Sequence, residues 1–308
     1  MLAGLILILL TGLAWGGCGV VLSYVSSRET DLDGFSFLAA TVGTLACWVI
    51  FPEYAKIAET GISLPVIKLA GLMMLAGAFA RTGLLFMQYA MKHGNHSVSW
   101  SIGQSALVLP FLSGLILFGN RCAWWQGIGV ALITGGLSLF GIAGKNTPAM
   151  RHPRQPSNSR SREPGYHWIL LALLAFLLLG SEQTLKTIPS VFPGWDDTYG
   201  LRIPMASLGG FLACSGIMLA RKARPVAKHL KPALGLVMIS LPGQWMLFKA
   251  LDTLGARQMA GIVFPAAVGI CILTFSAYCR FMLHEKNNRA GSAGIALVTA
   301  GIVLVALK

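Results

Sequence analysis

The stretch LLLGSEQTLK, from Leu177 to Lys186, decides how the chain is interpreted. It places a carboxylate, Glu182, and an ammonium group, Lys186, inside a run that is otherwise apolar enough to cross a bilayer. A charge at the centre of a bilayer costs roughly 2.5 to 3.5 kcal/mol on insertion scales, so an acid at that depth indicates a functional site. A local interpretation stays open as well, because opposite charges four residues apart in a helix can simply neutralise each other.

The composition of the chain excludes an ordinary soluble domain. Hydrophobic residues make up 55% of the 308 residues, charged residues make up 11%, and the mean hydropathy is +0.68. Soluble domains carry about 25% charged residues. A bilayer core about 30 Å thick requires roughly 20 apolar residues per helix. Runs of this kind predict ten transmembrane helices, at residues 2–25, 34–52, 66–91, 97–118, 123–143, 167–190, 199–220, 231–251, 258–283 and 290–307.

The two halves of the sequence resemble each other. The segments GVALITGG, from Gly129 to Gly136, and GIALVTAG, from Gly294 to Gly301, share five of eight residues in the same register. Trp15-Gly16 aligns with Leu179-Gly180 at nearly the same offset. A repeat of five helices crosses the membrane an odd number of times, so its two copies have opposite orientations. The sequence therefore predicts an all-α polytopic membrane protein with ten transmembrane helices arranged as two inverted five-helix repeats.

The predicted repeats, residues 1–143 and 167–308, flank a basic linker at 144–166 that is rich in Pro, Ser and Arg. The formal net charge of +13 could indicate a nucleic-acid partner, but Lys and Arg in a membrane protein first indicate its topology. Fifteen of them fall in the linker and the other loops after odd-numbered helices, and seven fall in the termini and the remaining loops. This bias predicts a cytoplasmic linker, both termini on the non-cytoplasmic side, and no nucleic-acid partner.

Charged residues at membrane depth define candidates for proton coupling. Of the eleven acidic residues, only Glu182 falls inside a predicted helix. Burial favours its neutral form and a nearby cation favours its carboxylate, so its protonation can depend on conformation. The candidates are therefore Glu182, Lys186 and Arg81, the last being the second cation at this depth. We predict a contact between Arg81 and Glu182. Capping of backbone carbonyls or snorkelling of Arg81 stays open as an alternative.

Other residues could bind a polar solute. Glutamines supply donors and acceptors, and indole rings supply flat apolar surfaces, although Trp in membrane proteins is most often an interfacial anchor. The substrate-binding candidates are Gln88, Trp100, Gln104, Gln244, Trp245 and Trp15. Prolines predict breaks that could line a cavity in four helices, at Pro110, Pro204, Pro242 and Pro265. The six cysteines form no CxxC motif, so we expect no metal and no cofactor.

Three stretches carry a resemblance to a known family. They are GTLACWVIFP from Gly43 to Pro52, AMKHGNHSVSW from Ala90 to Trp100, and HEKNNRAG from His284 to Gly291. With ten helices in two inverted halves, the chain resembles the drug/metabolite transporter superfamily (EamA-like, ten-helix) and is most similar to its L-rhamnose:proton symporter family.

The resemblance implies proton-coupled uptake of a small polar solute across a bacterial inner membrane. The expected solute is a sugar such as L-rhamnose or a related deoxy-sugar, and the proton and membrane lipids are the other expected partners. One segment departs from the family, because MAGIVFP, from Met259 to Pro265, lacks the polar and aromatic residues expected there. The solute can therefore differ from rhamnose.

Two other functions stay open. The first is an exporter of metabolites, amino acids or drugs on the same fold. A lipophilic-cation exporter requires a carboxylate without a fixed cation beside it, and Lys186 and Arg81 argue against that. The second is a non-transport membrane protein. No enzymatic activity is expected, since an enzyme requires clustered acids or histidines at membrane depth.

Reporter fusions test the predicted topology. Alkaline phosphatase fused after Lys308 should be active, and green fluorescent protein at the same position should be dark, because both termini are expected outside the cytoplasm. Fusions after Ser157, in the basic linker, serve as the control and should give the opposite pattern. A fluorescent fusion at Lys308 would contradict the orientation.

Overall fold

The computed structural model describes residues 2–28, 31–51, 63–116, 123–145, 167–191, 200–255, 263–285 and 288–307, and all of its regular elements are helices. Each of the ten predicted ranges contains helix. The elements are α1 (Leu2–Ser26), α2 (Leu32–Ile50), α4 (Leu64–His93), α5 (His96–Gln104), η1 (Ser105–Leu107), α6 (Val108–Ile116), α7 (Trp124–Lys145), α8 (His167–Val191), α9 (Arg202–Arg221), η3 (Ala227–His229), α10 (Leu230–Gly255), α11 (Val263–Phe281) and α12 (Arg289–Ala306).

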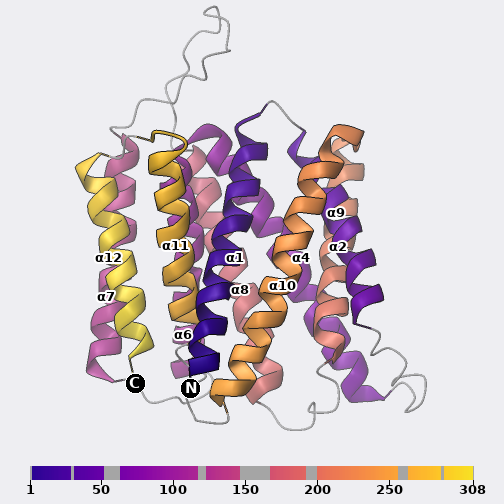
Figure 1. Ribbon diagram of the computed structural model, residues 1–308, viewed down its shortest axis with the longest axis horizontal. Helices are drawn as coiled ribbons and strands as arrows, with labels where there is room; N and C mark the ends of the chain where they lie inside the picture. The colour runs from indigo at the N-terminus through magenta and orange to yellow at the C-terminus, as the bar shows by residue number, and fades with distance from the viewer. Residues whose placement is uncertain are drawn as a thin grey trace, which may run out of the picture.

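Six of the described helices, α1, α2, α4, α8, α9 and α11, contain stretches long and apolar enough to cross a membrane. The expected α-helical membrane character is therefore confirmed. The helices run side by side as one bundle, and the first residue of α1 and the last of α12 lie at the same end (Figure 1). Residues 146–166, which make up nearly all of the basic linker, lie outside the described ranges.

Several polar groups in these apolar helices form local hydrogen bonds. Asn95 caps α5 by accepting a hydrogen bond from the Val98 amide at 2.9 Å, and Asn288 caps α12 in the same way. Thr134 and Thr299, which occupy matching positions of the sequence repeat, each donate to the carbonyl four residues earlier. At these positions the hydroxyl groups and the first helical amides have acceptors within the apolar environment.

The predicted helix at 97–118 is divided. A 3-10 turn at Ser105–Leu107 separates α5 from α6, and Pro110 follows in the first turn of α6. The expected break at Pro204 was wrong, because this proline lies in the first turn of α9, where no intrahelical amide bond is lost. The break predicted at Pro265 stays a prediction, since the residues just before α11 lie outside the described ranges. Pro242 does lie inside α10.

Glycines bring pairs of helices into backbone contact. A Cβ atom at Gly77 of α4 would overlap the carbonyl oxygen of Ala206, and one at Gly209 of α9 would overlap that of Met74. In α7 and α12, a Cβ at Gly129 would lie 2.7 Å from the Gly301 oxygen. One at Gly136 would lie 2.8 Å from the Gly294 oxygen. Small residues at helix interfaces are how membrane helices approach closely.

Two glycines of α9 allow a controlled test of this packing. We expect Gly209→Ala to destabilise the protein by about 1 to 3 kcal/mol, because the methyl group would force α4 and α9 apart. Gly216→Ala, where a Cβ atom meets nothing within 4 Å, should be neutral or slightly stabilising. Thermal unfolding in detergent, followed by tryptophan fluorescence, measures both. Equal melting temperatures for the two variants would contradict the contact.

Candidate functional site

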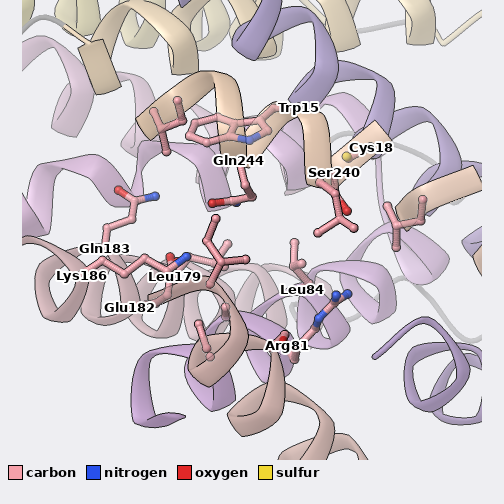
Figure 2. A pocket seen from close by; sticks show the side chains of 18 of the residues that line it. Trp15, Cys18, Arg81, Leu84, Leu179, Glu182, Gln183, Lys186, Ser240 and Gln244 are labelled. Carbon is pink, nitrogen blue, oxygen red and sulfur yellow. The ribbon is translucent and has the colours of Figure 1, made fainter. Parts of the chain in front are cut away.

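A cavity of about 220 Å³ lies in the bundle and is bounded by residues of α1, α2, α4, α5, α8, α9, α10 and α11. Its lining is mainly apolar. Seven of the nine predicted site residues line it, from five different helices: Trp15, Arg81, Trp100, Gln104, Glu182, Lys186 and Gln244. Figure 2 shows Trp15 and Gln244 on one wall, with the charged residues on the walls facing them.

Glu182 forms an ion pair with Lys186, one turn further along α8. Both side chains line the cavity, with relative exposures of 10% for Glu182 and 20% for Lys186. The pair is therefore largely removed from solvent yet accessible from the cavity. In this arrangement the ammonium compensates the carboxylate, and protonation of the carboxylate would release the ammonium.

The predicted contact between Arg81 and Glu182 is wrong for this conformation. Lys186 pairs with Glu182 instead, and in Figure 2 the guanidinium of Arg81 points away from that pair. The side chain extends towards α2, where a Cβ at Gly43 would lie 3.3 Å from its Nη2 atom. Its stem lies against Gly210 of α9, where a Cβ would approach its Cγ to 2.5 Å. Two glycines thus make room for Arg81.

The structure places two other candidates elsewhere. Gln88 is buried between α2 and α4, where its Oε1 accepts a hydrogen bond from the Ser36 hydroxyl at 3.3 Å. Trp245 is 49% exposed and lies outside the cavity lining. The expectation that both would face a common site with Arg81 and Gln244 therefore needs correction. Gln88 lies seven residues after Arg81 in α4, but it is not among the residues that line the cavity.

Several lining residues escaped the sequence analysis. Arg202 is one of the seven basic residues assigned to the termini and the remaining loops, but it is buried at the start of α9 and lines the cavity. Gln183 also lines the cavity, and its Oε1 atom is buried without a hydrogen-bond partner among the described residues. Ser240 on α10 adds a hydroxyl. The only available signal for Gln183 was its position beside Glu182.

Polar contacts gather at the end of the bundle where α4, α9 and α11 finish. Arg221 of α9 approaches Asp33 of α2 at 3.3 Å and donates to the Tyr89 hydroxyl at 3.0 Å. Ser23 of α1 is hydrogen-bonded to Nδ1 of His96 at 2.9 Å. These contacts tie α1, α2, α4, α5 and α9 together beyond the cavity.

Glu285 belongs to the same group of contacts. Its two carboxylate oxygens accept hydrogen bonds from the backbone amides of His96 at 2.6 Å and Ser97 at 3.1 Å, at the start of α5. The carboxylate is favourably placed there, because it caps amides at the positive end of the helix. Burial nevertheless raises the pKa of Glu285, against the lowering effect of those amides.

The comparisons with known proteins show a shared fold and no family. No protein-family model and no curated protein matches the chain. Sixteen chains of solved structures match. One is described only as "Crystal structure of protein"; it has a TM-score of 0.58 and 13% identity, over 97% of this chain and 94% of the other. At that identity the likeness shows the fold alone.

The Glu285 cap can be tested through its pH dependence. Glu285→Gln should lower stability by about 1 to 3 kcal/mol, because an amide NH2 would replace one oxygen that accepts from the α5 amides. Since the folded-state pKa of Glu285 is raised, its contribution is full below the unfolded pKa of about 4.3 and declines as the pH rises through the folded value.

The difference in melting temperature between wild type and Glu285→Gln should therefore narrow as the pH increases from about 4. Thermal unfolding at a series of pH values measures it. A difference that widens with pH would show that the cap depends on the charged carboxylate.

Proposed function

We propose that the protein is a secondary active transporter that moves a small polar solute together with a proton. The observation that carries the proposal is the Glu182–Lys186 ion pair on the wall of a cavity enclosed by apolar helices. A charge pair at such a position has to be maintained against the cost of its desolvation, which favours a functional role.

The proposed architecture is ten transmembrane helices in two inverted repeats, residues 1–143 and 167–308, joined by the cytoplasmic linker. Reciprocal contacts support it. The first helix of each repeat, α1 or α8, packs on the third helix of the other repeat, α10 or α4. Gly16 lies against the carbonyl of Cys271, and its counterpart Gly180 lies against the carbonyl of Ala106. Cys271 and Ala106 are themselves 165 residues apart, as expected of equivalent positions in the two repeats. The Gly129–Gly301 and Gly136–Gly294 contacts are reciprocal in the same sense.

Proton coupling would use the two states of Glu182. When its carboxylate is ionised, Lys186 neutralises it, as in this conformation. Protonation of Glu182 from the cavity would remove the attraction and leave Lys186 to a water molecule or to the solute. Alternating exposure of the cavity to the two sides of the membrane would then link proton binding to solute movement.

The lining suits a hydroxylated solute, in agreement with the resemblance to sugar carriers. Gln104 and Gln244 offer donors and acceptors, and Trp15 and Trp100 offer apolar ring surfaces. The volume of about 220 Å³ is below the roughly 300 to 1,000 Å³ typical of sites for drug-sized ligands. The cations Arg81 and Lys186 on the wall also disfavour export of lipophilic cations.

Proteoliposomes that contain an internal pH dye test the proton site. With wild-type protein, at least one solute from a panel of sugars, deoxy-sugars and sugar acids should acidify the lumen as it enters. Glu182→Gln should abolish this acidification, because no carboxyl group remains to carry the proton, whereas exchange of labelled for unlabelled solute should persist.

Glu285→Gln is the matched control, since it removes a buried acid outside the cavity. It should retain solute-driven acidification. Undiminished acidification by Glu182→Gln would refute the assignment of Glu182.

A further inference from the structure

Arg81 presents a positive charge to the cavity without a protein partner. It lies near the middle of α4, partly buried, on a different wall from the Glu182–Lys186 pair (Figure 2). It forms no hydrogen bond and no ion pair with any other described residue. The space for its side chain comes from Gly43 and Gly210, so the surrounding helices are shaped to accommodate it.

The acids whose side chains are described are all engaged elsewhere. Four have described side chains. Glu182 pairs with Lys186, Asp33 with Arg221, and Glu285 with the amides of α5. The fourth, Asp31, caps α2 and accepts from the Asp33 amide. None of these carboxylates compensates Arg81.

The cavity wall therefore has an excess of positive charge. Arg81, Lys186 and Arg202 line it together with a single acid among the described lining residues, Glu182. Lys186 is neutralised by Glu182, and Arg202 has interactions of its own. An uncompensated guanidinium away from bulk water is costly, and an anionic ligand would remove that cost.

We infer that Arg81 binds a carboxylate of the solute, so that the cavity is a site for a small hydroxylated monocarboxylic acid such as an aldonate. Transport of this acid rests on the proposed function, whereas its binding to Arg81 does not. A guanidinium can hold both carboxylate oxygens at once. Ser240 and Gln244 also line the cavity and can meet the hydroxyl groups of the solute.

Among the described lining cations, Arg81 is the one without a partner, and one negative charge would compensate it. A phosphate ester, with a charge between about −1.5 and −2 at neutral pH, would leave part of its charge unpaired. A neutral sugar would leave Arg81 itself unpaired. If one proton accompanies each monoanion, uptake is electroneutral, whereas a neutral sugar with a proton carries charge across the membrane.

Ligand-induced shifts of the melting temperature in detergent test binding without any transport assay. The probes are gluconate and galactonate, the neutral glucitol and galactitol of the same chain length, and inorganic phosphate. For wild type, we expect at least one sugar acid to raise the melting temperature and the hexitols and phosphate to have no effect. Arg81→Gln should bind that acid roughly 10- to 100-fold more weakly, and Arg81→Lys should restore part of the affinity.

Lys68→Gln is the control, since it removes an exposed cation from the same helix outside the cavity and should leave binding unchanged. The comparison of acids with hexitols on the wild type decides the matter even if Arg81→Gln does not fold. The inference fails if no acid binds, if hexitols or phosphate bind as well as the acids, or if a folded Arg81→Gln binds the acid with wild-type affinity.

The transport aspect has its own readout. In proteoliposomes, uptake of the acid driven by a pH gradient should not change when a potassium diffusion potential is imposed. Acceleration of uptake by an inside-negative potential would contradict electroneutral cotransport of one proton with each monoanion. Binding through Arg81 without any proton movement would contradict the proposed function and leave the carboxylate site intact.

Discussion

A charge inside an apolar helical bundle has to be compensated there, because the medium around it offers neither water nor counterions. The polar architecture of this protein follows from that constraint. Glu182 meets it within its own helix by pairing with Lys186. Asp33 and Glu285 meet it at one end of the bundle, with Arg221 and with the amides of α5. Arg81 is left to an external partner.

The sequence predicted the helices well, because length and hydropathy determine them directly. It also singled out Glu182, Lys186 and Arg81, since a charge in an apolar run is conspicuous whatever the fold. What it could not supply was the rotation of each helix. Lipid is as apolar as the protein interior, so hydrophobic periodicity does not separate the two faces. Trp245 was therefore placed in the site although it is 49% exposed.

Contacts between distant segments were harder still. The four-residue spacing already offered Lys186 as the partner of Glu182. That Arg81 does not reach Glu182 depends on how α4 and α8 pack, which no local pattern records. Arg202 looked like a loop charge because it stands at a helix boundary, yet α9 carries it to the cavity wall. Glu285 belonged to a recognisable motif, but its role as a cap for α5 required the fold to bring residues 189 positions apart together.

The backbone contact between α4 and α9 has a mechanical consequence. At Gly77 and Gly209 no side chain separates the two helices, so neither can tilt or slide without driving a carbonyl oxygen into the facing backbone. Arg81 and Arg202 are thus carried on one rigid unit. α8, which bears Glu182, meets α4 at Gly83 through the side chains of Leu178 and Leu179 rather than through its backbone. Any change in the shape of the cavity that preserves this contact would move the two arginines together relative to the ion pair.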